Sequence, residues 1–359
     1  MIAKDKYISD LEMRNIMKLI YETEKLKTLI IKTVQKTLSM DLVWEWPCGV
    51  AYYGVLKAYH AVKEEQFIEQ LSKWTKEYIK LSLPEWTVNS CAMGHIMLEL
   101  YKITKESIFL DIVESKLEYL KQKAIRFGDG VLQHTVSSAN DFPEQAWADT
   151  LFMAAYFMLR AGVEFSDEEL IIDALNQYDW HIKFLQNPAL GLWYHGYDNL
   201  KKNHMSGIYW ARANAWAAYT MSQVKPLLNN WYLYPQCMNI ECSLRDQLAT
   251  LKYLQTEKGL WRTVLDDPDS YEEVSASCGI AAAMLVNENP LHTPYVQKAL
   301  DGVCSNISED GRVLNVSGGT AVMKDKEGYK KVPKTWIQGW GQGLALVFLS
   351  KVLLNEEQK

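Results

Sequence analysis

Residues 144–159 read EQAWADTLFMAAYFML, and after the first position they contain a single charged side chain. Apolar side chains recur at helical spacing from Trp147 and Leu151 onward, and the opposite face of the stretch is almost as apolar. A helix that is apolar on every side is buried on every side. The stretch therefore predicts a helix in the interior of the protein, with one carboxylate, Asp149, near its start.

A lone carboxylate on a buried helix costs several kcal/mol unless it is paired, hydrogen-bonded or protonated. Asp149 is therefore expected either to hold the structure together or to take part in chemistry. Arg212 is an isolated charge in the similarly apolar stretch 207–221. A buried salt bridge between the two residues is the structural alternative to a role in which both are held apart for a substrate.

The rest of the chain shows a regular alternation of helical segments, which predicts the fold. Odd-numbered segments are amphipathic, whereas even-numbered ones are nearly uncharged and rich in Gly and Ala. Outer amphipathic helices around buried inner ones describe an all-α (α/α)6 toroid, expected to span residues 1–359 as a single domain. A helical bundle or an open superhelical array of helix pairs is the alternative. The twelve segments lie near residues 10–38, 48–62, 65–81, 90–103, 106–125, 145–161, 167–186, 207–224, 232–254, 274–286, 293–308 and 339–354.

The links from odd to even segments carry aromatic or Gly-centred signatures, and four of them recur as a degenerate repeat. Because helices alternate in direction, all six links are expected at one end of the ring. Functional loops and the positive N-terminal ends of the inner helices would meet there, which favours an anionic ligand. The signatures are Trp44-Glu45-Trp46, Pro84-Glu85-Trp86, Gly128-Asp129-Gly130, Gly191-Leu192-Trp193, Gly259-Leu260-Trp261 and Asp310-Gly311-Arg312.

Composition excludes several classes of protein. The net charge is -6 with no basic run, which argues against nucleic-acid binding. No apolar stretch approaches the roughly 18 residues of a membrane span, and we expect no signal peptide. The six cysteines form no CxxC pair, so we expect reduced thiols in a cytoplasmic protein, with no zinc or other metal and no cofactor. Thirteen Trp and 20 Tyr suit stacking on sugar rings.

Polar side chains expected at the rim of long links form a short set of candidates. His134 precedes the 145–161 helix, and His195 follows Gly191-Leu192-Trp193-Tyr194. Trp210, Arg212, Asn214 and Trp216 share the stretch 210–216, WARANAW. Each has a structural reading as well, because an isolated His is more often a satisfied loop residue than a catalytic one.

Three motifs in order resemble the unsaturated rhamnogalacturonyl hydrolases, glycoside hydrolase family 105, and their relatives in family 88, the unsaturated glucuronyl hydrolases. The motifs are Gln145-Ala-Trp-Ala-Asp149, Gly191-Leu-Trp-Tyr-His195 and Trp210-Ala-Arg212-Ala-Asn214-Ala-Trp216. The resemblance extends from about Trp46 to the segment 339–343, GWGQG. It implies an (α/α)6 barrel that acts on lyase-generated oligosaccharides carrying a 4,5-unsaturated uronic acid at the non-reducing end.

The reaction that this resemblance implies is hydration of the enol-ether double bond. Asp149 would protonate C4 and activate a water for C5, after which the hemiketal collapses and the aglycone leaves. An ordinary glycosidase needs two carboxylates, and we expect only one convincing acid at this rim, with a pKa raised by its apolar setting. The implied substrate-binding residues are Trp46, Asn89, His134, Trp147, His195, Trp210, Arg212 and Trp216, with Arg212 on the substrate carboxylate.

One departure from the family pattern concerns the start of the fourth segment, where an acid pair is common and this chain has Asn89-Ser90. We interpret it as a subgroup difference in substrate preference, against the alternative of an impaired enzyme. The sequence leaves open galacturonyl against glucuronyl configuration, the aglycone and the oligomeric state.

Competing functions on this fold are an N-acylglucosamine 2-epimerase-type sugar isomerase, an ordinary glucanase and a non-catalytic carbohydrate-binding toroid. The isomerases use histidine pairs on inner helices, where this chain has only His95. A glucanase needs a second acid, which Glu45 or Glu144 could supply from outside the inner helices. A binding toroid has no need of Asp149.

Overall fold

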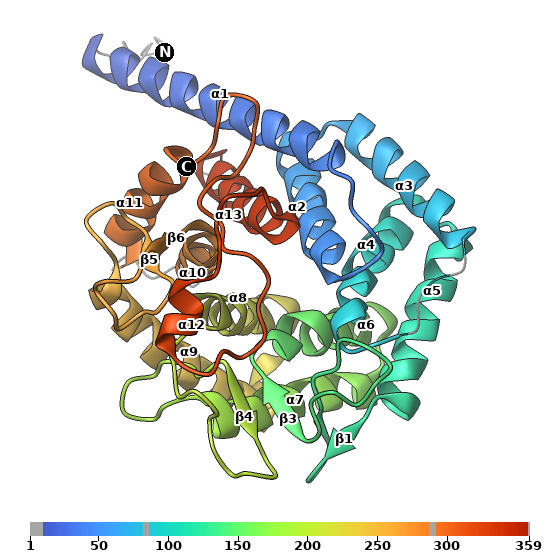
Figure 1. Cartoon of the computed structure of the whole chain (residues 1–359). Coiled ribbons are helices and arrows are strands. Elements are labelled where there is room, and N and C mark those ends of the chain that lie inside the picture. The colour runs from blue at the N-terminus through green and yellow to red at the C-terminus, as the bar shows by residue number, and fades with distance from the viewer. Residues whose placement is uncertain (1–9, 82, 84–85, 287–291, 358–359) are drawn as a thin grey trace, which may run out of the picture.

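Two concentric rings of helices make up the structure, a computed structural model that describes residues 10–81, 83, 86–286 and 292–357 (Figure 1). The inner ring consists of α2 (Trp46–Val62), α4 (Gly94–Thr104), α6 (Tyr156–Phe165), α8 (Ala211–Leu227), α10 (Val274–Val286) and α13 (Gly339–Glu357). The outer ring consists of α1 (Asp10–Leu38), α3 (Glu65–Ile79), α5 (Ser107–Glu118), α7 (Glu168–Leu185), α9 (Pro235–Leu254) and α11 (Thr293–Cys304). Residues 1–9 of the predicted domain, and Pro84 and Glu85 of the second link, lie outside the described residues.

The inner ring is closed, which confirms the predicted toroid and shows that the open array is wrong. Each inner helix contacts the next, and α13 contacts α2. Glycines make this last contact very close: a Cβ on Gly54 would lie 2.3 Å from the carbonyl oxygen of Gly343. A Cβ on Gly343 would lie 2.1 Å from the carbonyl oxygen of Val50. The absence of side chains therefore lets the first and last inner helices meet backbone to backbone.

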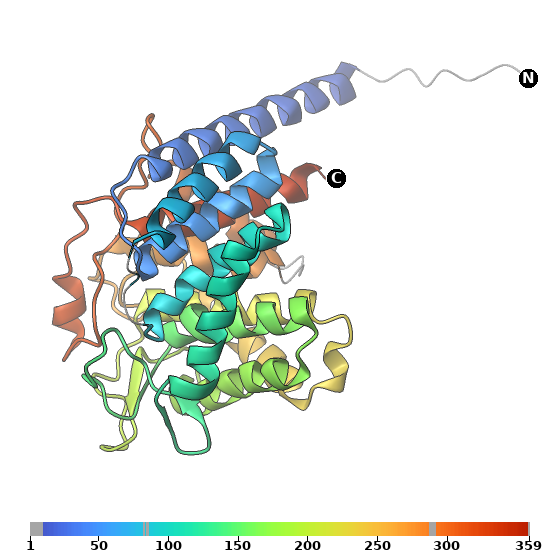
Figure 2. The ribbon, with the colours of Figure 1, turned by 90° about the vertical axis from the view of Figure 1, so that its right-hand side faces the viewer.

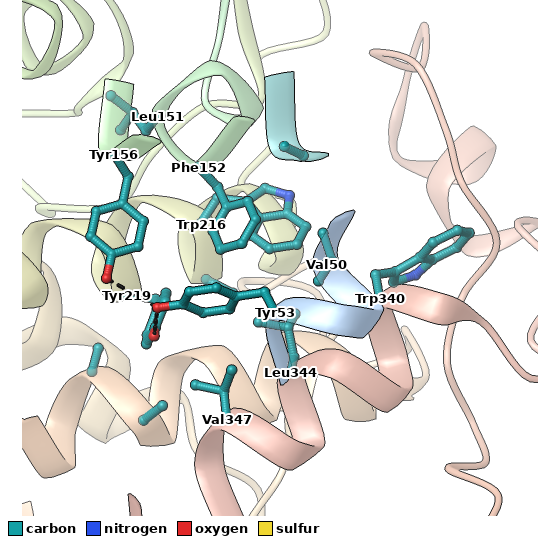
Figure 3. Close-up of a cluster of buried hydrophobic side chains, with 14 of the residues drawn as sticks. Val50, Tyr53, Leu151, Phe152, Tyr156, Trp216, Tyr219, Trp340, Leu344 and Val347 are labelled. Atoms are coloured by element: carbon teal, nitrogen blue, oxygen red, sulfur yellow. Dashed lines mark hydrogen bonds between the residues drawn. The ribbon is translucent and has the colours of Figure 1, made fainter. Parts of the chain in front are cut away.

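The centre of the ring is apolar with a small polar node (Figure 3). The Tyr53 hydroxyl hydrogen-bonds to the hydroxyls of Tyr156 at 3.0 Å and Tyr219 at 2.8 Å. Phe152 and Trp216 lie above this node, with ring centroids 5.0 Å apart. All five side chains are buried, so the ring encloses a packed core and not a pore.

The links from outer to inner helices lie together at one end of the rings, as Figure 2 shows for the long loops and short strands there. Among the described residues they contain three two-stranded antiparallel ribbons that the sequence did not predict. The last link also carries a short helix, α12 (Lys326–Lys330), which was not predicted either. The ribbons pair β1 (Arg126–Phe127) with β2 (Val131–Leu132), β3 (Gln145–Trp147) with β4 (Gly196–Asp198), and β5 (Trp261–Arg262) with β6 (Glu272–Glu273).

The Gly-centred signatures in these links have a common structural role. Gly191 has a φ of +70°, and a Cβ on it would lie 2.5 Å from the backbone of Asp246 in α9. Two residues later, the backbone N–H of Trp193 donates to Asn214 Oδ1 at 2.8 Å. The equivalent N–H groups of Leu132, Trp261 and Val313 donate to Gln177, Ser277 and Gln342. The repeat therefore fastens each link between an outer helix and a polar anchor on a neighbouring helix.

Several predicted helix ends need correction. The segment predicted as a helix over 145–161 begins as strand β3, continues through a π-helical turn, η3 (Leu151–Ala155), and only then becomes α6. The helix predicted over 90–103 begins with a 3-10 turn, η1 (Asn89–Met93), and the one over 106–125 ends in the π turn η2 (Tyr119–Lys123). A 3-10 turn, η4 (Trp231–Leu233), precedes α9. None of the described helices combines the length and apolar character that a membrane crossing requires.

Candidate active site

A pocket of about 600 Å³ opens among the long links, at the end of the rings where the site was expected. It is lined by aromatic, charged and amide side chains at the first four links, together with residues 319–321 of the last one. Seven of the nine predicted site residues line it: Trp46, Asn89, His134, Trp147, Asp149, Trp210 and Arg212. Glu45, Pro47, Val136, Phe142 and residues 319–321 complete the lining.

The β3–β4 ribbon brings His195 to Asp149. Its register pairs Trp147 with Gly196, and the next backbone bond runs from the N–H of Ala148 to the carbonyl of His195 at 3.0 Å. As a result, Nε2 of His195 lies 3.3 Å from Oδ2 of Asp149. Both atoms are buried, and neither has another hydrogen-bond partner in the described part of the chain. His195 is fully enclosed behind Asp149, so it contacts the carboxylate and not the open pocket.

The net pKa of Asp149 is lowered, contrary to the raised value expected from its apolar surroundings. Burial does raise the pKa of this carboxyl, but the His195 hydrogen bond and nearby positive charge, including that of Arg212, outweigh burial. Only 16% of the Asp149 side chain is exposed, and Oδ2 is turned inward. The free enzyme therefore presents an ionised carboxylate to the pocket at neutral pH, with its other oxygen held from behind.

His134 lies in the wall beside Asp149. Its ring stacks on Trp147, with centroids 4.4 Å apart and planes 12° from parallel. Its Nδ1 hydrogen-bonds to the hydroxyl of Thr150 at 3.0 Å. Burial lowers the pKa of His134 to about 4 despite the attraction of Asp149. His134 is therefore a neutral hydrogen-bonding group at neutral pH.

Arg212 does not form a salt bridge with Asp149, which was the structural alternative for these two residues. Its Nη1 lies 3.5 Å from Oε1 of Glu273, and both side chains are 1% exposed. The guanidinium also donates to Ser317 Oγ at 2.5 Å and to the backbone carbonyls of Ser317 and Gly318. Its plane lies over the Trp210 ring, 4.4 Å from the centroid. The interaction with Asp149 is thus through space, and Arg212 keeps a surface toward the pocket.

Two of the candidate residues lie outside the pocket lining, and a third lines it while stacking on a neighbouring ring. Trp216 does not line the pocket; it lies in the core beside Phe152, fully buried (Figure 3). Asn214, a candidate at the rim, uses its amide to hold both backbone groups of Trp193. Trp46 lines the pocket and stacks on Trp340 at a centroid distance of 4.6 Å.

Sequence reasoning missed three residues around the site and underrated a fourth. Glu273 and Ser317 hold Arg212, and Tyr329 hydrogen-bonds to His195. These three lie outside the signatures of their links, so only the fold brings them to the pocket. Glu45 was weighed as a second acid but placed away from the inner helices, whereas the structure puts it in the pocket lining. Burial raises the pKa of Glu45.

No group of three or more His, Cys, Asp or Glu side chains in the described residues has the geometry to hold a metal ion. All six cysteines are free, and four of them are buried. The pocket offers one ionised carboxylate, one neutral histidine, one arginine and the half-buried Glu45, with a second neutral histidine, His195, behind the carboxylate.

A closed (α/α)6 toroid with an acid, an arginine and several Trp at its long-link end defines a class of carbohydrate-active enzyme. The model of glycosyl hydrolase family 88 matches residues 22–355, and the chain belongs to this family. It is therefore a glycoside hydrolase.

Particular relatives narrow this class. The chain is 50% identical over 341 residues to the unsaturated rhamnogalacturonyl hydrolase YesR of Bacillus subtilis, covering 95% of this chain and 98% of YesR. Among solved structures, it resembles a protein of Salmonella enterica described as a possible member of the GH105 family. That match has a TM-score of 0.87 at 26% identity and covers 93% of this chain and 94% of the other. A similar protein of Klebsiella pneumoniae has a TM-score of 0.86 at 25% identity, with coverage of 92% and 93%.

Proposed function

We propose that this glycoside hydrolase removes a 4,5-unsaturated uronic acid from the non-reducing end of oligosaccharides released by polysaccharide lyases. The observation that carries the proposal is a single well-held carboxylate, Asp149, in the same pocket as the arginine Arg212. The similarity to YesR, an unsaturated rhamnogalacturonyl hydrolase, covers nearly all of both chains and supports the same substrate class. The reaction that these residues suit is hydration of the enol-ether double bond.

One carboxyl group suffices for hydration because C4 and C5 of the substrate are directly bonded. Protonated Asp149 gives its proton to C4, and the resulting carboxylate takes a proton from the water that adds to C5. The C5 hemiketal opens to a ketone, which frees the ring oxygen as the hydroxyl of a hemiacetal at C1. That hemiacetal collapses to an aldehyde and releases the aglycone, so the enzyme returns to its starting protonation state.

The lowered pKa of Asp149 fits this scheme when the substrate charge is included. In the free enzyme, Arg212 helps to keep Asp149 ionised. A substrate carboxylate bound to Arg212 neutralises that charge and adds a like charge near Asp149, and both effects raise the pKa of the acid. Binding of the correct, anionic sugar thus promotes the protonated form that the first step needs.

Arg212 is suited to a carboxylate because part of its fork remains unused. The recorded donors are Nη1, to Ser317, and one bond from Nη2, to Gly318. Nε has no protein acceptor in the described residues, and it lies on the side-on edge of the guanidinium, an edge that binds carboxylates in a bidentate manner. Glu273 balances the charge from behind without occupying this edge.

The remaining lining suits a sugar ring and its hydroxyls. Trp46, Trp147 and Trp210 offer aromatic surface, and His134 offers a neutral ring nitrogen. The Asn89 side chain makes no hydrogen bond to the described protein residues and is available to the substrate. We assign His195 an indirect role behind Asp149, and Trp216 a supporting role in the core beside Phe152.

A direct attack at the anomeric carbon is the competing mechanism, because Glu45 gives the pocket a second carboxyl group. The two mechanisms differ in the substrates they accept. A hydratase cleaves the unsaturated disaccharide and not its saturated uronide counterpart, whereas a conventional hydrolase accepts both. In deuterium oxide, hydration also places one deuterium on C4 of the released sugar, which NMR detects.

Asp149→Asn is the matching variant, and it should fold normally and lose about a thousandfold or more of the activity on the unsaturated substrate. Loss of ultraviolet absorbance by the conjugated double bond follows the reaction directly. Cleavage of the saturated uronide, or near-normal turnover by Asp149→Asn, would rule out the proposal.

We further propose a cytoplasmic location, which the six free cysteines support. The imported substrate would then be a short oligosaccharide and not a polymer. No role with nucleic acid or membranes is proposed.

A further inference from the structure

The loop between α11 and α13 reaches into the site from the outside of the pocket. It runs across the open end of the rings and carries α12 (Figures 1 and 2). Tyr329 of α12 is fully buried, and its hydroxyl lies 2.7 Å from Nδ1 of His195. Its ring stacks against Trp210 at a centroid distance of 5.8 Å. Tyr329, His195 and Asp149 thus form a series of polar contacts, with Tyr329 at its outer end and Asp149 at its inner end.

At the outer end of this hydrogen-bonded series, one bond to the Tyr329 hydroxyl has a fixed direction. The backbone N–H of Met323 donates to the Tyr329 oxygen at 3.2 Å. Burial raises the pKa of Tyr329, although the bonds donated by Ser206 and Met323 lower it in part, so the phenol keeps its proton. With its oxygen accepting from these donors, the Tyr329 O–H is left to donate to His195 Nδ1.

The contact between His195 and Asp149, at the inner end of this series, requires the same placement of the imidazole hydrogen. Burial lowers the pKa of His195 more than the Asp149 carboxylate raises it, so the ring is neutral. A neutral imidazole has one donor and one acceptor nitrogen. Because Nδ1 accepts from Tyr329, Nε2 carries the hydrogen, and it faces Asp149 Oδ2 at 3.3 Å. Both ends of the series therefore select one tautomer.

We propose that Tyr329 is a positioning residue that holds His195 as the neutral Nε2–H tautomer and thereby orients the Asp149 carboxylate. The inference rests on the proposed role of Asp149. The same loop also supplies the carbonyls of Ser317 and Gly318 to Arg212 and lines the pocket at residues 319–321. One loop thus sets the geometry of the acid and of the carboxylate-binding arginine together.

Tyr329→Phe removes the donated bond and keeps the ring that packs on Trp210. Without that donor, Nδ1 is a stronger base, so the His195 pKa rises. The other charged or titratable groups near His195 are Asp149 and Arg212, with His134 on the far side of Asp149, and the variant changes none of them. We expect kcat to fall by about tenfold to a hundredfold, with KM little changed. The acidic limb of the pH–rate profile should move to higher pH, because a protonated His195 clamps Asp149 as an ion pair.

Asp267→Asn is the matched control. Asp267 Oδ2 pairs with Lys326 at 3.6 Å and with Lys330 at 3.3 Å, and these ion pairs hold α12 without touching His195. The Asn variant keeps the acceptor for the Asp269 N–H. It should lower thermal stability while the acidic limb stays in place. If both variants shift the limb equally, Tyr329 acts only by holding the loop, and the inference is overturned.

A measurement without substrate separates this inference from the proposed reaction. In 15N-histidine-labelled enzyme, identified by comparison with His195→Gln, the wild-type signal should report the Nε2–H tautomer and resist protonation on acidification. Tyr329→Phe should show protonation at higher pH. An Nδ1–H tautomer in the wild type overturns the role of Tyr329 whatever the reaction is. Full activity of Asp149→Asn would instead overturn the proposed function and leave the tautomer result standing.

Discussion

Asn89 lines the same pocket as Asp149, and a charge at this position would bear on the Asp149 carboxyl group. Both residues line the pocket, and Asn89 is 8% exposed. Asn89→Asp adds a like charge, which raises the pKa of Asp149 from its lowered value. Because the first step needs protonated Asp149, the pKa of this acid in the free enzyme sets the basic limb of kcat/KM, and a raised pKa should move that limb to higher pH.

Asn229→Asp provides the control for Asn89→Asp, because it adds the same charge in the exposed link between α8 and α9, at the opposite end of the rings. We also expect Asn89→Asp to change the preference across a panel of unsaturated disaccharides, since an amide donor is lost. If preference and pH profile both match the parent, Asn89 does not touch the substrate.

The effect of Arg212 on substrate binding can be separated from its effect on protein stability by comparing two variants. Removal of the charge in Arg212→Met leaves Glu273 buried and unpaired, which should cost about 3–5 kcal/mol of the free energy of unfolding. Arg212→Lys keeps a cation beside Glu273 but loses the fork. For the lysine variant we expect a modest loss in melting temperature and a KM for the unsaturated substrate raised about tenfold or more. An unchanged KM would place the substrate carboxylate elsewhere.

The sequence predicted which residues are isolated charges, but not which of them pair. Asp149 and Arg212 stood out because they interrupt apolar helices, and both line the pocket as expected. Glu273 lies in an ordinary polar link, where nothing distinguishes it from Glu272 beside it. Its burial follows from its place in the β5–β6 ribbon. Its carboxylate accepts hydrogen bonds from the backbone N–H groups of Ala276 and Ser317. Such partners depend on tertiary structure, which a single sequence does not display.

At the scale of elements, helical periodicity was reliable inside helices and misleading at their ends. Trp147 continued the apolar spacing of Leu151, yet it belongs to strand β3. The strand forms because its backbone pairs with β4, some 50 residues away in the chain. The pairing could not be predicted from the local pattern, and it is the feature that places His195 behind Asp149.

Asn214 is the anchor that keeps the link before α8 in this position. Its amide accepts from the Trp193 N–H and donates to the carbonyls of Trp193 and Trp210. Asn214→Leu leaves these buried groups without partners, which should cost roughly 2–5 kcal/mol of unfolding free energy and lower kcat, since His195 lies two residues beyond Trp193. Asn239→Ala, on the exposed face of α9, is the control. Urea unfolding together with kcat measures both effects; equal stability of the two variants would contradict the anchor role.

For the whole molecule, the closed ring was predictable because the inner segments are apolar on all sides. An open array would leave part of that surface in water. The sequence did not show how closely the ring closes, because that depends on Gly54 and Gly343 facing each other across α2 and α13. Trp46 and Trp340, at the start of the same two helices, stack on one another beside the pocket.

Gly343→Ala tests this contact. The added methyl meets the backbone of Val50 and not a flexible side chain, so the two helices must move apart. We expect a loss of about 3 kcal/mol or more in the free energy of unfolding and reduced activity, because the separated helices shift Trp46. Thermal melts and kcat/KM on the unsaturated substrate measure the two effects. Parental stability in this variant would show that α2 and α13 do not approach as closely as described.

The α2–α13 contact also has a consequence for how the protein is made on the ribosome. The first inner helix is synthesised early, but the helix it packs against is the last to emerge. Until then, the glycine-lined face of α2 remains uncovered, and nascent chains must wait for nearly complete synthesis before the ring can close. A polypeptide released before residue 339 would lack this partner, including Trp340, which stacks on the pocket residue Trp46. Such a product would expose α2 and leave the ring open, so we expect hydrolytic activity only from chains that extend through α13.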